Sequence, residues 1–319
     1  MSNSLRQNAP VNDTILVSET CACASPKHPI LLATDGSTLA ESAVRVGAAL
    51  AQRADAGALA VSAVLPIPAC AFAPDGSILS VVSAESEEHE RWVRGDGIAD
   101  QLRRAAVPSE WPVFVDTGDA TDVIIGRANE TSASLIVMGL RAHGSSDRVS
   151  RDETTLRVMR EARVPVLGVI QLLHDLPKNI VVAIDFSRAS LRAARVALSV
   201  AGAGASVTLV CVQPECANVS EELEGRQLYL IQGLEAAFVR LRKVLSPLSD
   251  VTIESAVLEG AAAPEILSFA ERIGADLVAI GSRRRGLRSR VALGSVTSKV
   301  VRAAQCSVLV VPPGATDRS

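Results

Sequence analysis

The sequence predicts an α/β protein made of two tandem domains, each a five-stranded parallel sheet with helices on both faces. Three observations support this fold class. Short apolar strands alternate with helical segments about five times in each half of the chain. The order of segments in the first half restarts in the second half, which indicates an internal duplication. Hydrophobic residues make up 48% of the chain and aromatic residues only 3%, a composition typical of buried parallel strands.

The first repeat, residues 29–172, follows a flexible leader of residues 1–28, in which 11–17 have the pattern of a short strand. The repeat opens with ILLATDGS (30–37), a buried strand that ends in Asp-Gly-Ser. A charged helical segment at 83–106 is predicted to be interrupted at Gly95-Asp96-Gly97. The other expected strands are 58–65, 113–115, 135–139 and 165–170, and the other expected helices are about 38–53, 120–130 and 154–161.

The second repeat, residues 178–313, follows a linker at 172–178 and precedes a tail of residues 314–319. It opens with IVVAIDFS (180–187), which matches ILLATDGS in the first repeat. Ser187 is expected to cap the next helix, which carries Leu191, Ala194 and Leu198 at helical spacing. The other expected strands are 206–212, 251–257, 277–281 and 307–311, and the other expected helices are about 221–245 and 263–273.

A ligand site is expected where the strand order of each sheet reverses, beyond the carboxyl ends of the strands. In the common arrangement, strands one and four flank this crevice. Asp185 then faces Gly281 in the second domain, and Asp35 faces Gly139 in the first. A second interpretation of the two aspartates stays open, because each could simply cap the helix that follows it.

The segment 277–311 contains the features expected of a phosphate site. Gly281 ends a strand, which lets the backbone approach a ligand closely. Gly294-Ser295 opens a helix and offers free N–H groups, a hydroxyl and the positive end of the helix dipole. The loop between them is rich in arginine, and its alternative interpretation is a solvated loop. Its arginines are Arg283, Arg284, Arg285, Arg288 and Arg290.

Neither of the two common phosphate fingerprints, GxGxxG after the first strand or GxxxxGK[ST], is present. An Asp at the end of strand one, combined with GSRRRGLRSRVALGSVTSKV (281–300), resembles the universal stress protein family. The resemblance covers the chain after residue 28, as two tandem copies. ATP-binding members of that family carry a glycine, two residues, a second glycine, nine residues, and then Gly-Ser or Gly-Thr. Arg284 stands in place of the second glycine, so a guanidinium replaces close backbone approach at that point.

The resemblance implies a Rossmann-like (adenine nucleotide alpha hydrolase-like) fold and a stress-linked sensor or regulator that binds ATP together with Mg²⁺. It also implies that the last strands of the two domains, 165–170 and 307–311, pair with each other, and that two chains form a homodimer. By the same resemblance Ala183 and Asp185 line the nucleoside and Val212 lies near the adenine. The remaining implied residues are Ile280 and Gly281 by the ribose, with Arg283, Arg284, Gly294, Ser295, Val296 and Thr297 at the phosphates.

The first repeat departs further from this pattern. The same spacing keeps Gly139 but places Ala142 at the second glycine and Asp152-Glu153 at Gly-Ser. In a partly shielded site, each carboxylate would repel a triphosphate by an energy on the order of a few kcal/mol. The first domain is therefore expected to be a degenerate, structural copy, although Gly144-Ser145 leaves room for an altered site.

Charge and hydropathy exclude some classes of function. A net charge of −3 and a pI near 5.9 argue against a general nucleic-acid binder. The apolar runs fall short of the roughly 20 residues of a membrane-spanning helix, and the leader lacks the apolar core of a signal peptide. We therefore expect a cytoplasmic protein without membrane or nucleic-acid partners. Cys211 and Cys306 are expected in the core, whereas Cys21 and Cys23 form a CxC whose role stays open.

Patterns typical of catalysis or of a protein-bound metal are not recognisable in the sequence. It shows no Ser-His-Asp or Cys-His arrangement in a familiar context, and its four histidines are dispersed. Trp92 and Trp111 are expected to be packing residues and not platforms for a ligand. We therefore favour a sensor over an enzyme. The alternatives are a protein-interaction module without a nucleotide, and a slow ATPase or nucleotidyl transferase.

Overall fold

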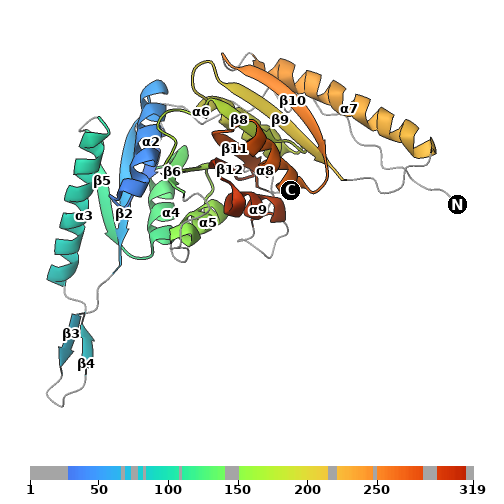
Figure 1. The fold of residues 1–319 in the computed structure, drawn as a ribbon. Helices are drawn as coiled ribbons and strands as arrows, with labels where there is room; N and C mark the ends of the chain where they lie inside the picture. The colour runs from blue at the N-terminus through green and yellow to red at the C-terminus, as the bar shows by residue number, and fades with distance from the viewer. Residues whose placement is uncertain are drawn as a thin grey trace.

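The computed structural model describes residues 28–65, 69–72, 78–81, 84–107, 110–140, 151–214, 221–246, 250–282 and 293–313. The predicted strand at 11–17, the CxC of Cys21 and Cys23, and the arginine-rich loop therefore lie outside the described residues. Within them, strands and helices alternate through both halves of the chain, as the sequence predicts (Figure 1).

The first domain has the predicted strands and helices, together with a hairpin that is not predicted. Its strands are β1 (Ile30–Ala33), β2 (Ala58–Val64), β3 (Ala69–Phe72), β4 (Ile78–Val81), β5 (Val113–Thr117), β6 (Leu135–Gly139) and β7 (Val166–Val169). Its helices are the 3₁₀ turn η2 (Thr38–Ala40), α2 (Glu41–Arg53), α3 (Ala84–Arg104), α4 (Ala120–Glu130) and α5 (Arg151–Glu161).

The second domain repeats this order without a hairpin in its described residues. Its strands are β8 (Asn179–Ala183), β9 (Ser206–Gln213), β10 (Thr252–Glu259), β11 (Leu277–Gly281) and β12 (Ser307–Val311). Its helices are α6 (Arg188–Val200), α7 (Glu221–Leu245), α8 (Ala262–Arg272) and α9 (Ser295–Ala303). The duplication predicted from the sequence is therefore a duplication of structure.

The two five-stranded sheets join into one ten-stranded sheet with the order β10-β9-β8-β11-β12-β7-β6-β1-β2-β5. In this ten-stranded sheet, neighbouring strands of the same domain are parallel. At the centre β7 and β12 pair antiparallel, with Leu309 opposite Leu167. The expected pairing of the last strands is confirmed, and both strands are buried because sheet continues on either side of them.

Two apolar layers hold the helices against the sheet. Side chains from α2, α3, α6 and α7 pack on one face of the sheet, and side chains from α4, α5, α8 and α9 pack on the other. The buried residues are almost all Val, Leu, Ile and Ala, as the composition predicts. Cys211 and Cys306 are both buried, which confirms their expected place in the core.

Helix α3 corrects one prediction, because it runs without a break through Gly95-Asp96-Gly97. A glycine inside a helix costs only about 1 kcal/mol relative to alanine. Ile98, Gln101 and Leu102 are buried one turn further on, and their packing against the sheet outweighs this cost. The intrinsic preference of the two glycines is therefore overridden by tertiary contacts.

The hairpin β3–β4 extends away from the rest of the first domain (Figure 1). Its signal in the sequence is Pro74-Asp75-Gly76 between two apolar runs, a typical hairpin turn. On the helix that follows, the side chain of Trp92 is 67% exposed and stacks on His89. Trp92 therefore lies at the surface and packs on His89, whereas Trp111 packs against the core.

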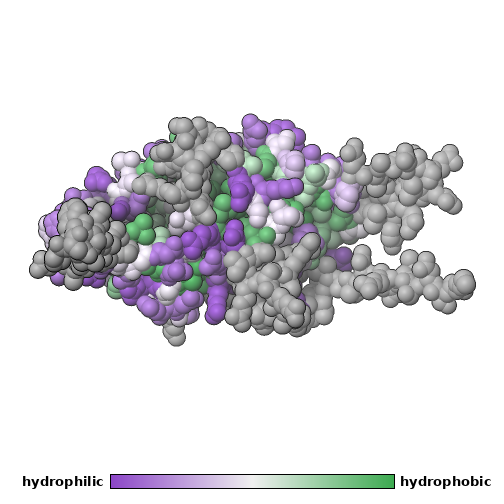
Figure 2. All heavy atoms as spheres, turned by 90° about the horizontal axis from the view of Figure 1, so that it is seen from below, coloured by the Kyte–Doolittle hydropathy of each residue, from purple (hydrophilic) through white to green (hydrophobic). Residues whose placement is uncertain are grey.

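Exposed apolar side chains on the described part of the chain are scattered. Hydrophobic residues (green) alternate with hydrophilic ones (purple) over the face seen from below (Figure 2). Among the described residues, no helix is long and apolar enough to cross a membrane.

Candidate functional site

The predicted crevice lies at the carboxyl ends of β8 and β11, which are neighbours in the sheet. Ala183 pairs with Ile280 across the two strands, so Asp185 and Gly281 follow at the same edge. The first domain repeats this frame, with Ala33 opposite Met138 and with Asp35 and Gly139 beyond them. The expected arrangement of the two aspartates and two glycines is thus present in the fold.

Hydrogen bonds among its own residues and the first turn of α6 hold the loop that carries Asp185. The carboxylate Oδ1 of Asp185 accepts a hydrogen bond from the N–H of Ser187 at 2.9 Å. Ser187 in turn caps α6, because its Oγ accepts from the N–H of Ser190 at 3.3 Å. The cap of α6 is therefore Ser187, as predicted, and the alternative that Asp185 caps this helix is wrong. Asp185 itself is exposed.

Strand β9 contributes backbone groups to the same crevice. The N–H of Ile184 donates to the carbonyl of Val210 at 2.7 Å, so the backbone of Val210 points toward β8. Residues two apart in a strand point to the same side, so Val212 also directs its N–H and its carbonyl that way. Because β8 ends at Ala183, these two groups lie above the end of the neighbouring strand. They offer one donor and one acceptor to a ligand.

Packing gives a second reason for a glycine at position 281, beside the close approach to a ligand that the sequence predicts. A Cβ placed on Gly281 would lie 2.6 Å from the carbonyl carbon and oxygen of Ala189 and 2.8 Å from the nitrogen of Ser190. The first turn of α6 therefore occupies the space next to this glycine. At the equivalent Gly139, the nearest atom is the carbonyl oxygen of Leu39 at 3.5 Å, an ordinary contact distance.

Helix α9 begins beside β11. Its N-cap is Gly294, which provides no side-chain hydrogen bond to the first turn. The N–H of Ser298 donates to the carbonyl of Gly294 at 2.9 Å, so the orphan donors of the helix are those of its first residues. Ser295 is exposed, whereas Thr297 is buried and its hydroxyl donates to the carbonyl of Gly281 at 3.4 Å. Only the backbone of Thr297 thus remains to donate to a phosphate.

The first domain has the same contact between strand four and the following helix. The hydroxyl of Thr155 donates to the carbonyl of Gly139 at 3.1 Å, with the same spacing of 16 residues as Thr297 and Gly281. This spacing aligns the two halves without a gap and places Asp152-Glu153 at the positions of Gly294-Ser295. The structural match therefore supports the alignment behind the degenerate first site.

A polar clip, formed by Thr34, Ser37 and Gln101, braces the loop after β1 in the first domain. The hydroxyl of Thr34 donates to Oε1 of Gln101 at 2.7 Å, and Nε2 of Gln101 donates to the carbonyl of Ser37 at 2.7 Å. Arg94 adds a hydrogen bond to the carbonyl of Asp35 at 2.6 Å. Gln101 and Arg94 both come from α3, so this helix reaches over the end of β1.

Of the predicted site residues, the structure brings most to one edge of the second domain and leaves two undescribed. Arg283 and Arg284 lie outside the described residues. Among the described residues, no group of three or more His, Cys, Asp or Glu side chains is arranged to hold a metal ion. The residues placed at this edge are Ala183, Asp185, Val212, Ile280, Gly281, Gly294, Ser295, Val296 and Thr297.

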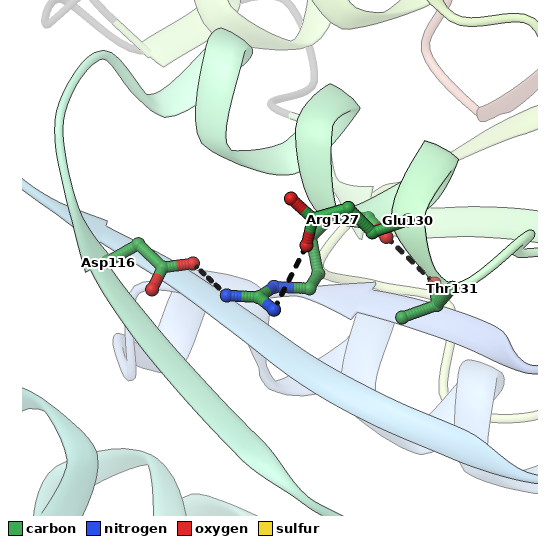
Figure 3. Close-up of polar contacts among 4 residues, drawn as sticks. All are labelled: Asp116, Arg127, Glu130 and Thr131. Atoms are coloured by element: carbon green, nitrogen blue, oxygen red, sulfur yellow. Dashed lines mark hydrogen bonds and ion pairs between the residues drawn. The ribbon is translucent and has the colours of Figure 1, made fainter.

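Ion pairs cluster around α4 of the first domain, outside the crevice. Arg127 donates to Asp116 at 2.6 Å and pairs with Glu130 at 3.1 Å (Figure 3). It also lies 4.2 Å from the centre of the Phe114 ring. The hydrogen bond with Asp116 raises the pKa of Arg127. The geometry ties the helix to the outer strand β5, so we interpret this cluster as structural.

A second pair joins α4 to α5. Asp119 caps α4 by accepting from the N–H of Thr121 at 2.9 Å, and its other oxygen accepts from Arg157 at 2.9 Å. The bond with Arg157 lowers the pKa of Asp119. The second domain has Ala261 and Lys299 at the equivalent positions, so it lacks this acid–base pair.

The surroundings of the two buried thiols, Cys211 and Cys306, lower their reactivity. Burial raises the pKa of Cys211, and the nearby charge of Asp185 raises it further. Burial also raises the pKa of Cys306, to about 11. Because the thiolate is the reactive form, both cysteines are expected to be inert at neutral pH.

Comparison with known proteins agrees with the resemblance noted in the sequence. The model of the universal stress protein family matches the chain twice, over residues 27–169 and 177–312. A universal stress protein of Methanocaldococcus jannaschii is 35% identical over 152 residues, which cover 45% of this chain and 87% of that protein.

Two solved structures extend the comparison to the fold. A universal stress protein from Archaeoglobus fulgidus has a TM-score of 0.60 at 20% identity, covering 91% of this chain and 98% of that one. A family protein from Arabidopsis thaliana with AMP bound covers 45% of this chain and 96% of its own, at 20% identity and a TM-score of 0.34. The first likeness concerns the fold, and the second is too limited to bear on the ligand. With two matches of the family model that together span most of its length, the chain belongs to the universal stress protein family.

Proposed function

We propose that the second domain binds a nucleotide, ATP with Mg²⁺, and that the protein acts as a stress-linked sensor or regulator. The observation that carries the proposal is the position of the α9 N-terminus. Its N-cap is a glycine without a side-chain hydrogen bond, and its buried Thr297 is bonded to the last residue of β11. Free N–H groups and the positive end of the helix dipole therefore lie beside the carboxyl end of β11, the strand next to β8 and the loop of Asp185.

Each part of a nucleotide has a matching group in this arrangement. The N–H and carbonyl of Val212 supply the donor and acceptor that the edge of an adenine needs. Asp185 and Gly281, at the carboxyl ends of the neighbouring strands β8 and β11, would lie by the ribose. Phosphates would accept from the first N–H groups of α9 and from Ser295, and in the sequence Arg283 and Arg284 follow β11 toward the same end.

The proposed Mg²⁺ would be held mainly by the phosphates. This cation keeps several water ligands and needs only one or two carboxylates from a protein. Asp185, the exposed carboxylate at the described edge of the site, is assigned to the nucleoside, so we assign the ion no ligand from the protein. When bound, the ion would neutralise charge on the phosphates.

Calorimetric titration of ATP with Mg²⁺ tests the proposal, after the purified protein has been checked for carried nucleotide. The paired change Gly294→Asp with Ser295→Glu gives the second domain the residues of the first. We expect one nucleotide per chain, and loss of binding in this variant through charge repulsion. Asp152→Ala with Glu153→Ala is the matched control in the first domain and should bind as the unchanged protein does.

The outcomes separate the alternatives. Two nucleotides per chain would contradict the degenerate first site. Absence of both binding and carried nucleotide would refute the proposal and favour a protein-interaction module. Sustained hydrolysis that is lost in the Gly294→Asp, Ser295→Glu variant would favour the enzyme. The proposal includes a homodimer of chains, which light scattering of the eluted protein measures directly.

A further inference from the structure

The residue after Asp185 has an unusual backbone conformation. Phe186 has a φ of +58°, in the left-handed region. That region is unfavourable for a bulky residue, because its Cβ crowds the backbone. The first domain has Gly36 at this position, with a φ of +76°, where glycine adopts the conformation without cost. The same turn therefore carries a strained residue only in the domain with the candidate site.

An aromatic contact holds this strained residue in place. The ring of Phe186 meets the ring of Phe238 edge to face, with centroids 5.2 Å apart and planes at 60°. Phe238 lies on α7 and is only 2% exposed, so its ring is fixed in the core. Phe186 is partly buried against the same core layer. We name this contact the aromatic clip.

The aromatic clip acts on the two residues that flank Phe186. On one side Asp185 accepts from the N–H of Ser187, and on the other side Ser187 caps α6. Rotation of the backbone at Phe186 would break the hydrogen bond between Ser187 and Asp185, because that bond spans Phe186. Fixing its ring therefore fixes the direction of the exposed Asp185 carboxylate.

The first domain braces the equivalent turn differently. There the polar clip of Thr34, Gln101 and Ser37 comes from α3, and a glycine occupies the strained position. Both domains thus hold the loop after strand one with a side chain from the long helix. The residue at the left-handed position contributes its own side chain to this contact only in the second domain, where it is Phe186.

We infer that Phe186 is a positioning residue for nucleotide binding, which acts by holding Asp185 toward the nucleoside. The inference rests on the proposed function of the second domain. Preorganisation lowers the entropy that a loop loses when it binds a ligand. Strain that is kept beside a site by surrounding packing is consistent with such a role.

The test combines nucleotide affinity, stability and amide exchange for four variants. Phe186→Gly removes the ring and the strain together, so its opposing effects on unfolding should largely cancel. Its nucleotide affinity should fall about tenfold, because the loop must then be ordered on binding. Phe238→Leu removes only the partner ring and should weaken binding about threefold. Phe186→Tyr keeps the ring and should bind normally, as should Gln101→Leu, the matched change in the polar clip.

Amide exchange of the segment 184–190 without ligand gives an independent measurement. Phe186→Gly should speed exchange of the Ser187 N–H about tenfold, because the hydrogen bond to Asp185 opens more often. Unchanged exchange, or unchanged affinity in a protein that binds ATP, would overturn the inference and leave the proposed function standing. A fall in stability without a fall in affinity would show a purely structural role. Failure of the unchanged protein to bind nucleotide would refute both.

Discussion

Substitution of Gly281 by alanine distinguishes the two reasons for a glycine at the end of β11. The added Cβ would lie 2.6 Å from Ala189, about 0.8 Å inside ordinary contact distance. The Cβ is attached directly to the backbone of β11, and the atoms that it meets belong to the backbone of α6, so one of the two elements must move. Overpacking of this kind costs about 1–3 kcal/mol of unfolding free energy. A smaller gain of about 0.4–1 kcal/mol arises because alanine restricts the unfolded chain.

Gly139→Ala in the first domain is the matched control. Its Cβ would meet the carbonyl oxygen of Leu39 at 3.5 Å, which requires no movement. We expect this variant to be unchanged or slightly more stable, whereas Gly281→Ala should lose about 1–2 kcal/mol overall. Urea unfolding followed by circular dichroism gives both values.

The result that would refute this reasoning is equal stability of the two variants. If Gly281→Ala were as stable as Gly139→Ala but had lost its affinity for ATP, the glycine would serve the ligand. A loss of stability with affinity retained in the folded fraction would show that packing alone requires it.

Three further predictions concern stability. Asp119→Ala should lose the cap of α4 and the pair with Arg157, about 1 kcal/mol in thermal unfolding, whereas Asp119→Asn keeps a capping oxygen and should lose less. Thr121→Ala should be neutral or stabilising by up to about 1 kcal/mol in the same assay, because the buried Thr121 hydroxyl has no hydrogen-bond partner among the described residues. The second domain has Ala263 at the equivalent position. A clear loss of stability would show that the hydroxyl has a partner. The pKa of Cys306 is raised from 9.0 to about 11, so its contribution to stability is full below pH 9 and falls between pH 9 and 11, by roughly 2 kcal/mol. Urea unfolding across this range should show a shallower loss for Cys306→Ala, and equal slopes would contradict the shift.

The sequence predicts the fold well because its signals are repeated. The matching segments ILLATDGS and IVVAIDFS establish the duplication, and the spacing of later strands follows in both halves. Predictions from local propensity are wrong where tertiary packing determines the secondary structure. The helix α3 continues through Gly95 and Gly97 because the turn after them is buried. The hairpin β3–β4 has a readable turn signal but is not predicted, because it stands outside the order of strands and helices that the two repeats share.

The candidate site is predicted less completely, since several of its features depend on contacts between distant segments. A sequence shows that Gly281 is a glycine, but not that Ala189 on α6 lies against it. It shows a hydroxyl at Thr297, but not that this hydroxyl is bonded to Gly281. The left-handed backbone of Phe186 has no local signal either, because bulky residues rarely adopt it.

The central pairing of β7 with β12 has a consequence for how the two halves could diverge. In a symmetric dimer of identical chains, every substitution appears twice, once in each site. In a fused chain the partners remain together at any dilution, because a short linker gives an effective concentration in the millimolar range. Each half is then free to vary alone. Acidic residues at Asp152 and Glu153 could therefore arise in one half while Gly294 and Ser295 were kept in the other, at no cost to the assembly of the sheet.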